Sequence, residues 1–250
     1  MATLSPPPAD TGIAAFRAGL PAQTRGSPIA DRLCALGETV HLAKGAQLAP
    51  DPHGDRLVYI ASGCAKLVAP SCTGPGAGAP INQVLAFHFG GDLVSVLRQC
   101  DGDFRLVGLS ACALVIFPAD RFLDTAQADP AVLRAVLTRS LQALHRSRTR
   151  MMQMGHKSAG ARIADFLVSM AERLADCKAG ACAFSLPMSR RDIGDSLGLT
   201  IETVSRQLTE LRDAGLVATE GRSKVCLSDV SALARIAGRQ FRVTGITPIN

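Results

Sequence analysis

The chain has 250 residues, of which 47% are apolar and 19% are charged, a balance that suits one large domain or two smaller ones. This composition excludes a globally disordered chain. Unbroken apolar stretches such as Ala113–Phe117 are too short to span a bilayer, and Met1–Gln23 lacks the basic, apolar and small-residue order of a secretion signal. We therefore expect a soluble, cytoplasmic protein that makes no membrane contact.

The charge balance is basic, with a formal net charge of +6 that comes from 22 arginines and 5 lysines against 21 acids. Because the planar guanidinium group fits phosphates and guanine edges, the arginine excess favours a nucleic-acid partner. A GC-rich coding bias, which raises arginine, alanine and glycine together, explains the same composition equally well. With no tryptophan and one tyrosine, platforms for stacking single-stranded bases are poor.

The eight cysteines are scattered, with no C-x-x-C pair and no zinc-finger spacing. We interpret most of them as free thiols that serve as small buried apolar residues. Neither a metal site nor another cofactor is expected. Motifs of a nucleophile elbow, a zinc protease or a phosphate loop do not occur, so the chain is not predicted to be an enzyme.

The first half of the chain changes from an irregular tail to strands. Residues 1–28, rich in proline, alanine and glycine, are predicted to form a flexible tail with room for a helical turn at Ile13–Ala18. A short helix is expected at Ile29–Leu36, with Gly37 as its C-cap. Residues 29–128 contain short apolar runs bounded by turn residues, a pattern typical of a β-sandwich or β-roll. The runs are Val40–Leu42, Leu57–Ala61, Ala65–Val68, Val84–Phe89, Leu93–Val96, Phe104–Ser110 and Ala113–Phe117.

Residues 129–156 favour one long amphipathic helix. Asp129 suits the N-cap position, and Pro130 suits the first helical position. The apolar positions that recur at seven-residue intervals are Leu137, Leu144 and Met151. This spacing is typical of a seam between two helices, which predicts dimerisation. A single helix lying on its own β-roll produces the same periodicity, so the pattern leaves both interpretations open.

Residues 157–229 show the element order of a winged helix-turn-helix. The expected elements are a helix at Ser158–Leu174, a loop at Asp176–Ser185, helices at Arg190–Leu197 and Ile201–Ala214 joined by Gly198, and strands at Leu216–Thr219 and Lys224–Leu227. Residues 230–250 are assigned to a C-terminal tail. The predicted fold class is therefore α+β, with a β-roll, a long helix and a winged helix-turn-helix in chain order.

The second helix of this motif carries side chains suited to a DNA groove. The apolar positions that can close a core between the two helices are Ile193, Leu197, Leu199, Val204 and Leu208. The remaining positions, Glu202, Ser205 and Arg206, are expected to face outward. There glutamate can accept a hydrogen bond from cytosine N4, and arginine can donate to guanine O6 and N7 together. At four-residue spacing, Glu202 and Arg206 can also pair with each other. An ordinary αα-hairpin with a solvated salt bridge is the competing interpretation.

The stretch Met188–Arg206 (MSRRDIGDSLGLTIETVSR) resembles the helix-turn-helix of the CRP/FNR transcription regulators. The E-x-x-S-R arrangement of its three outward residues is similar to the FNR and FixK branch rather than to the cyclic-AMP branch. Upstream, Tyr59–Lys66 and Phe89–Val94 resemble strands of the family's β-roll, a jelly roll like that of cyclic-nucleotide-binding domains. Residues 129–155 fall where the family's dimerisation helix lies.

This resemblance implies a homodimer that binds double-stranded DNA, with the second helix of each copy in a major groove, one helical turn apart. It implies inverted repeats of TTGAT-type half-sites, RNA polymerase as a partner, and activation of genes for low-oxygen or respiratory metabolism. Bases would be read by Glu202, Ser205 and Arg206. The positions that match the family's phosphate contacts are Ser189, Arg190, Thr200 and Thr203.

The chain also departs from the family's patterns. Members with an iron–sulfur cluster carry grouped N-terminal cysteines, whereas only Cys34 precedes the β-roll here. The stretch that corresponds to the nucleotide-binding segment of the cyclic-AMP branch, Gly91–Val94 through Arg105, lacks its pattern, and Asp92 would repel a phosphate. Three inputs stay open: no small ligand, haem or nitric oxide, and an unknown effector in a degenerate nucleotide pocket. The candidate axial ligands for haem are His41, His53 and His88.

Cys177 and Cys182 lie in the predicted loop before the helix-turn-helix. Lys178 favours a thiolate at Cys177, and the thiolate is the form that oxidises. Oxidation of either residue is therefore a candidate control of DNA affinity. A local disulfide between them and two inert loop residues are the alternatives.

Overall fold

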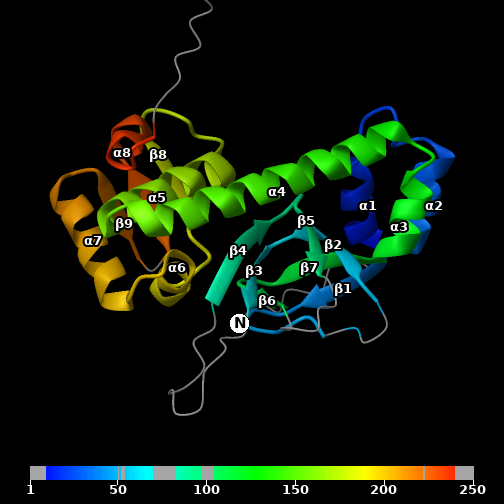
Figure 1. Ribbon diagram of the computed structural model, residues 1–250, viewed down its shortest axis with the longest axis horizontal. Coiled ribbons are helices and arrows are strands. Elements are labelled where there is room, and N and C mark those ends of the chain that lie inside the picture. Colours follow the sequence, from blue (N-terminus) through cyan, green and yellow to red (C-terminus); the bar gives the residue numbers. More distant parts are fainter. Residues whose placement is uncertain are drawn as a thin grey trace, which may run out of the picture. The chain divides into compact units, whose positions relative to one another are not determined.

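The computed structural model describes residues 10–49, 51, 54–69, 83–96, 104–221 and 223–239 of the chain (Figure 1). The chain divides into two compact units, Met1–Thr149 and Arg150–Asn250. The boundary falls within α4 (Pro130–His156), the long helix predicted over residues 129–156. The first unit contains antiparallel sheets and the second contains the helix-turn-helix, so the predicted α+β fold class is confirmed.

Within the described residues, seven strands build the sheets of the first unit, and each predicted run is present to within two residues at either end. They are β1 (Glu38–Leu42), β2 (Arg56–Ser62), β3 (Cys64–Ala69), β4 (Gln83–Phe89), β5 (Leu93–Val96), β6 (Arg105–Gly108) and β7 (Cys112–Pro118). The strand orders are β1-β7-β2-β5 and β4-β3-β6. Val58 and Leu114 of the first sheet and Leu106 of the second belong to one buried cluster, because alternate side chains of each strand point to the same face.

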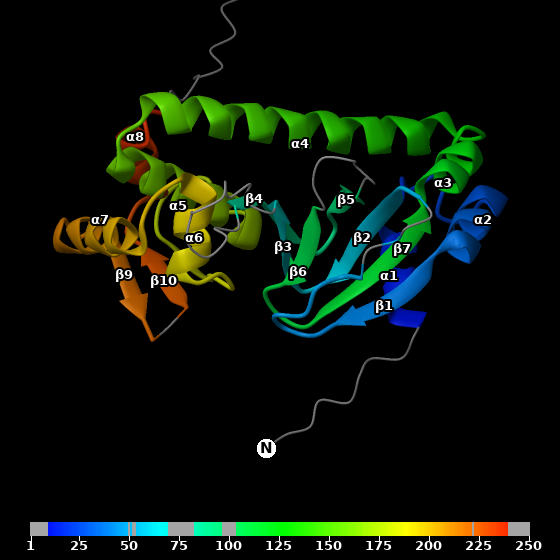
Figure 2. The same cartoon turned by 60° about the horizontal axis from the view of Figure 1, so that its bottom comes forward.

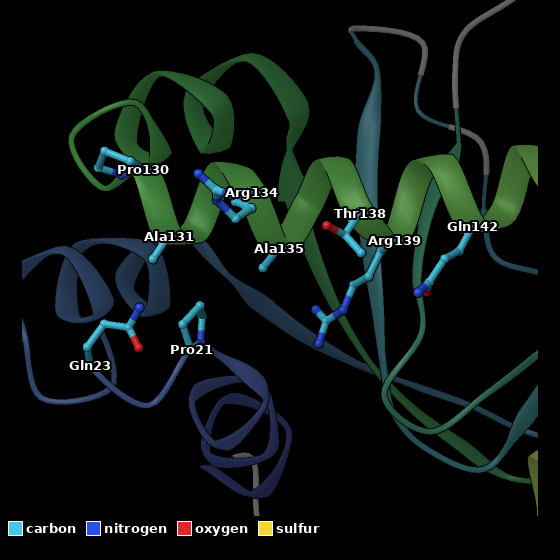
Figure 3. A pocket seen from close by; sticks show the side chains of 9 residues that line it. All are labelled: Pro21, Gln23, Pro130, Ala131, Arg134, Ala135, Thr138, Arg139 and Gln142. Carbon is cyan, nitrogen blue, oxygen red and sulfur yellow. The ribbon is translucent and has the colours of Figure 1, made fainter. Parts of the chain in front are cut away.

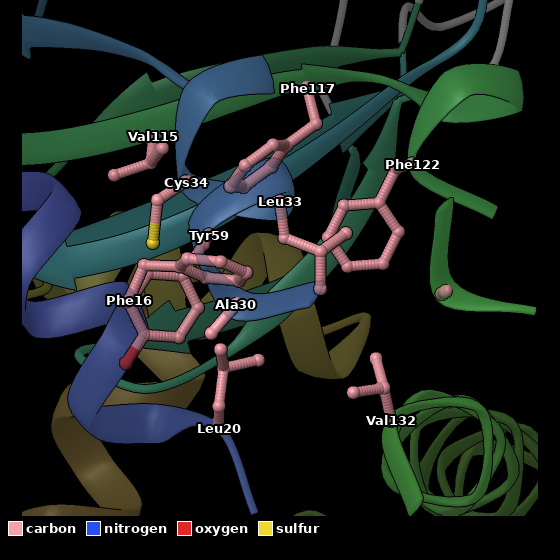
Figure 4. Close-up of a cluster of buried hydrophobic side chains, with 11 residues drawn as sticks. Phe16, Leu20, Ala30, Leu33, Cys34, Tyr59, Val115, Phe117, Phe122 and Val132 are labelled. Carbon is pink, nitrogen blue, oxygen red and sulfur yellow. The ribbon is translucent and has the colours of Figure 1, made fainter. Parts of the chain in front are cut away.

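Helix α1 (Asp10–Gly19) lies within the stretch predicted to be a flexible tail, so that prediction is wrong for residues 10–28. Phe16 is only 3% exposed and belongs to the aromatic cluster of Figure 4. Its ring centroid lies 4.7 Å from that of Phe117 and 5.4 Å from that of Tyr59. Only a helical turn at Ile13–Ala18 was expected here, because the proline, alanine and glycine around it are typical of an irregular segment. Residues 1–9 lie outside the described ranges.

Two more helices complete this cluster. Helix α2 (Pro28–Leu36) begins after Ser27, whose Oγ accepts the N–H of Ala30 at 3.3 Å. Helix α3 (Ala119–Ala126), which was not predicted, follows β7 directly.

Gly37 is not the left-handed C-cap that we expected, because its φ is −82°. A Cβ at this position would lie 2.7 Å from Val115 Cγ1, so the glycine is required by close packing.

Asp129 caps the start of α4, as predicted. Its Oδ1 accepts the N–H of Ala131 at 2.9 Å, and its Oδ2 accepts the hydroxyl of the buried Thr24 at 2.6 Å. The bond from Thr24 is the main reason that the pKa of Asp129 lies below its ordinary value. Within the described ranges, none of the helices combines the length and the apolar content that crossing a membrane requires.

In the described part of the second unit, helices pack against a small sheet. Its elements are α5 (Ala159–Ala175), β8 (Cys182–Ser185), α6 (Arg190–Leu197), α7 (Ile201–Asp213), β9 (Val217–Glu220), β10 (Lys224–Leu227) and α8 (Val230–Ile236). The three strands are antiparallel in the order β8-β10-β9, and Figure 2 shows β9 and β10 side by side beyond α7. The helix predicted at Ser158–Leu174 and both helices of the helix-turn-helix are confirmed.

Two predictions about this unit are wrong. Residues 230–239 are not part of a tail, since α8 packs on α5 through buried Val230, Leu233 and Ala234. The stretch Asp176–Ser185 is not all loop, because its second half forms β8 and pairs with β10. Residues 240–250 lie outside the described ranges.

The Thr24–Asp129 hydrogen bond should make the stability of the fold depend on pH. Thr24→Val removes the donor, so the pKa of Asp129 should rise toward its ordinary value. A lowered pKa stabilises the fold at pH above the ordinary carboxyl pKa, and this contribution is lost as the pH falls through the lowered value. The melting-temperature difference between wild type and variant should therefore shrink on acidification.

Carboxyl-carbon NMR titration of Asp129 measures the shift directly. Thr125→Val is the matched control, because the Thr125 hydroxyl donates to the carbonyl of Arg121 and not to a carboxylate. An Asp129 pKa unchanged by Thr24→Val would contradict the assignment.

Candidate nucleic-acid interface

Helix α6 starts with a reciprocal cap. The Oγ of Ser189 accepts the N–H of Asp192 at 3.1 Å, and Asp192 Oδ2 accepts the N–H of Ser189 at 2.8 Å. The Ser189 hydroxyl also donates to the same carboxylate oxygen at 2.6 Å. Two backbone donors of the first turn are thereby satisfied, which fixes where the helix begins. Arg190 and Arg191 follow the cap and are exposed.

The turn between α6 and α7 depends on two glycines. A Cβ on Gly194 would lie 2.6 Å from the carbonyl oxygen of Leu199, so only glycine lets the chain return this closely. Gly198 ends α6 with a φ of +64°, a left-handed conformation that glycine adopts without strain. Ile193, Leu197 and Val204 are buried between the helices as predicted, and Leu199 and Leu208 are half-buried.

Helix α7 begins at a threonine cap. The Oγ1 of Thr200 accepts the N–H of Thr203 at 3.2 Å, and the two hydroxyl oxygens lie 3.1 Å apart. The carboxylate of Glu202 accepts from its own backbone N–H and then from Thr200, and these bonds hold its pKa below the ordinary value. Glu202 therefore stays ionised in the first turn, where the helix dipole favours negative charge.

Arg206 does not pair with Glu202, the partner that its spacing offered. Its Nε lies 3.8 Å from Glu210 Oε1 instead, and Gln207 donates to the other oxygen of Glu210 at 2.8 Å. Arg206 is exposed and its ion pair is long, so this contact holds the guanidinium group only weakly. The group stays available to another acceptor.

The structure brings Arg190 and Ser205 together across the two helices. Arg190 Nη1 donates to Ser205 Oγ at 3.1 Å. Ser189, Thr200, Glu202 and Arg206 are exposed, and Thr203 and Ser205 are half-exposed. All seven residues that the sequence singled out for DNA thus come from α6, α7 and their caps, and they are accessible.

The predicted dimer positions on α4 are exposed. The fractional exposures of the large apolar side chains along this helix are 59% for Leu137, 55% for Leu141, 46% for Leu144 and 67% for Met151. We call these four residues the α4 row. A row of exposed large apolar side chains is typical of a surface that binds another protein.

The two cysteines differ from each other. Cys182 begins β8 and is 9% exposed, and burial, followed by its contact with Cys177, raises its pKa to about 11. The raised pKa favours the protonated thiol at Cys182. Cys177 is half-exposed, with its Sγ 3.6 Å from the carbonyl oxygen of Ala179, and both residues are free thiols. Control of DNA affinity by oxidation stays a prediction for both cysteines.

The histidines considered as haem ligands have different surroundings. His41 is exposed, His53 lies outside the described residues, and His88 is buried. His88 Nδ1 lies 3.5 Å from Asp92 Oδ2, which also accepts the N–H of Phe89 at 3.0 Å. Asp92 therefore braces the turn after β4. In the part of the chain that the structure describes, no three histidine, cysteine or acidic side chains are grouped to hold a metal ion.

An open groove of about 720 Å³ lies in the first unit, between α4 and the segment that joins α1 to α2 (Figure 3). Pro21 and Gln23 line one side, and Arg134 and Arg139 are among the residues of the α4 side. Arg139 Nη2 also donates to the carbonyl of Gly19 at 3.1 Å. The groove does not involve Gly91–Val94, so it is not the degenerate nucleotide pocket that the sequence left open.

Two helices joined by a tight glycine turn, followed by a β-hairpin, define a winged helix-turn-helix of the DNA-binding class. The model of the Crp-like helix-turn-helix domain matches residues 161–236. The nitrogen fixation regulation protein FixK of Azorhizobium caulinodans is 32% identical over 227 residues, covering 90% of this chain and 86% of the relative. The transcriptional activator protein Anr of Pseudomonas protegens is 31% identical over 201 residues, covering 79% of each.

The structure of FixK2 from Bradyrhizobium japonicum aligns with a TM-score of 0.65 at 25% identity, over 80% of this chain and 96% of that one. The chain belongs to the CRP/FNR family of DNA-binding transcription regulators and is FixK-like within it.

The raised pKa of Cys182 predicts its reactivity. Because burial raises the pKa of Cys182 to about 11, the thiol is protonated in nearly all molecules at neutral pH. Cys182 should therefore react with iodoacetamide far more slowly in the folded protein than in the same protein unfolded in urea. Peptide mapping by mass spectrometry measures this for Cys182 separately from the other thiols. Equal rates in the two states would contradict the assignment.

Proposed function

We propose that the protein binds, as a homodimer, an inverted repeat of TTGAT-type half-sites and recruits RNA polymerase to activate genes for low-oxygen or respiratory metabolism. The observation that carries the proposal is the accessible face of α7, which presents Glu202, Ser205 and Arg206. A threonine cap and a glycine turn fix the start of this helix. The relative named as a transcriptional activator supports activation.

The chemistry of this face fits the half-site. Arg206 can bind one guanine through O6 and N7, and the ionised Glu202 can accept from N4 of the cytosine opposite a guanine. Ser205 stands between them in the sequence and can approach a thymine methyl group. The weak pair between Arg206 and Glu210 is readily exchanged for a base edge.

Phosphate contacts are assigned to the residues around the two helix starts. Ser189 and Thr200 cap α6 and α7, where free backbone N–H groups and the helix dipole favour an anion. Arg190 and Thr203 lie beside these caps. These four residues set the register on the duplex without reading its sequence.

The α4 row supports the homodimer. Leu137, Leu144 and Met151 recur at seven-residue intervals and are exposed, and a second copy of α4 would cover them as a two-helix seam. The helix carries no acid between Pro130 and His156, so apolar contact and not interhelical ion pairing would hold such a seam.

Two arginine variants separate base reading from phosphate contact. Arg206→Ala should cost about 1–3 kcal/mol on the inverted repeat and relax specificity, because a bidentate guanine contact is lost. Arg190→Ala should weaken all sequences about equally and reduce the slope of log affinity against log salt by about one.

Fluorescence anisotropy with inverted-repeat and scrambled duplexes, over a series of salt concentrations, distinguishes the two effects. The division between a base reader and a phosphate holder is wrong if both variants change the two duplexes in the same way.

Leu144→Arg tests the dimer. The change places a charge within the α4 row of an already basic helix, so we expect a monomer that binds one half-site weakly. Ala143→Arg is the control, because it adds the same charge at an exposed neighbouring position outside the row. Sedimentation equilibrium measures the mass. An unchanged dimer mass for Leu144→Arg would remove the row from the interface.

A further inference from the structure

A buried carboxylate on α5 contacts three other polar side chains of the second unit. Asp165 on α5 is 6% exposed, and both of its oxygens are occupied. Oδ1 accepts from Arg239 Nε at 2.7 Å and lies 3.4 Å from Lys157 Nζ, and Oδ2 accepts from Gln153 Nε2 at 2.6 Å. We call Gln153, Lys157, Asp165 and Arg239 the Asp165 cluster.

The cluster joins three segments that are separate in the sequence. Gln153 belongs to the last turns of α4, Lys157 lies between α4 and α5, and Arg239 follows α8. Arg239 also reaches along α5, where it donates to Ser169 Oγ at 2.5 Å and to Glu172 Oε1 at 2.8 Å. All of these residues belong to the second unit, so the cluster is internal to it.

The elements tied by the cluster also hold the DNA-reading helices. Helix α5 packs against α7, and Arg162 of α5 donates from Nη1 to the carbonyl of Leu197 at the end of α6 at 2.8 Å. A continuous path of contacts therefore runs from Gln153 through Asp165 and α5 to the helix-turn-helix. The end of α4 and the reading face of α7 cannot change their relative direction without breaking it.

Stability alone does not account for charges at this place. Burying a carboxylate with its cations costs hydration energy, and apolar side chains of similar volume usually hold helices together at least as well. Charged hydrogen bonds differ from apolar contacts because they are directional, with narrow ranges of length and angle. Directional bonds of this kind favour a single geometry between the segments that they join.

We propose that Asp165 is a positioning residue for DNA binding, which fixes the direction of α7 relative to the last turns of α4 and thereby the half-site spacing that the protein accepts. The inference rests on the proposed dimer on two half-sites. One base pair of added spacing turns a half-site by about a tenth of a helical turn, so a rigid connection should reject it. A loosened connection should tolerate it.

The test measures affinity for three kinds of duplex of equal length. One has two half-sites at the preferred spacing, one has the spacing changed by a base pair in either direction, and one has a single half-site. Asp165→Asn keeps the shape of the side chain and removes its charge. Arg239→Gln breaks the same cluster from the other side and leaves Asp165 with Lys157 and Gln153. Arg235→Gln is the control, since it removes an exposed arginine from α8 four residues before Arg239.

Wild type and Arg235→Gln should prefer one spacing by about tenfold or more, because simultaneous engagement of two sites multiplies affinity only when the geometry fits. Asp165→Asn and Arg239→Gln should lose most of that preference and keep single-half-site affinity within about twofold.

If Asp165→Asn does not fold, Arg239→Gln decides the question. Unchanged spacing preference in a folded cluster variant overturns the inference, as does an equal loss on every duplex, which indicates a purely structural role. If wild type binds two half-sites no better than one, the proposed dimeric function fails first and the inference with it.

Discussion

The proposed DNA-reading surface exists because the chain returns closely on itself after α6. At Gly194 the space for a Cβ is taken by the carbonyl oxygen of Leu199, and the Leu199 N–H donates back to the Gly194 carbonyl at 3.0 Å. Val204, fully buried, packs against this contact. The direction of α7 follows from the turn, and with it the outward position of Glu202 and Arg206. A larger side chain at position 194 would separate the helices and turn the face away.

Several polar residues at this surface already make hydrogen bonds within the protein that stabilise the fold. The Ser189 hydroxyl already donates to Asp192, and the hydroxyls of Thr200 and Thr203 share one hydrogen bond. Among the described residues, exposed contacts with Ser205 and Glu210 hold the guanidinium groups of Arg190 and Arg206. Arginine therefore carries most of the surface's freedom to bind, because its donors can leave these weak partners at little cost.

Much of the fold could be predicted from local sequence patterns. The seven β-roll strands alternate or run apolar between turn residues, and both helices of the helix-turn-helix have clear caps in Ser189 and Thr200. Helices α3 and α8 were not predicted because each is at most eight residues long, which is too short to show a clear helical period. Their buried residues nevertheless repeat at helical spacing, as in Val230, Leu233 and Ala234, which is the signal that could have found them.

The side-chain pairing at the site was harder to predict than its residues. Arg206 has a glutamate four residues away on either side, and sequence spacing cannot choose between Glu202 and Glu210. The choice follows from the N-terminus of α7, where the backbone N–H of Glu202 and the Thr200 hydroxyl bind the Glu202 carboxylate first. The Asp165 cluster was invisible for a related reason, since Arg239 lies 74 residues from Asp165 in the chain.

Methylation interference on an inverted-repeat duplex tests the central claim most directly, because it reports contacts at guanine N7 in the major groove. We expect interference at one guanine in each half-site, on one face of the duplex and about 10 base pairs apart, and its loss in the Arg206→Ala variant. Interference that is absent, spread evenly along the duplex, or unchanged by Arg206→Ala would contradict the assignment of α7 as the helix that reads DNA.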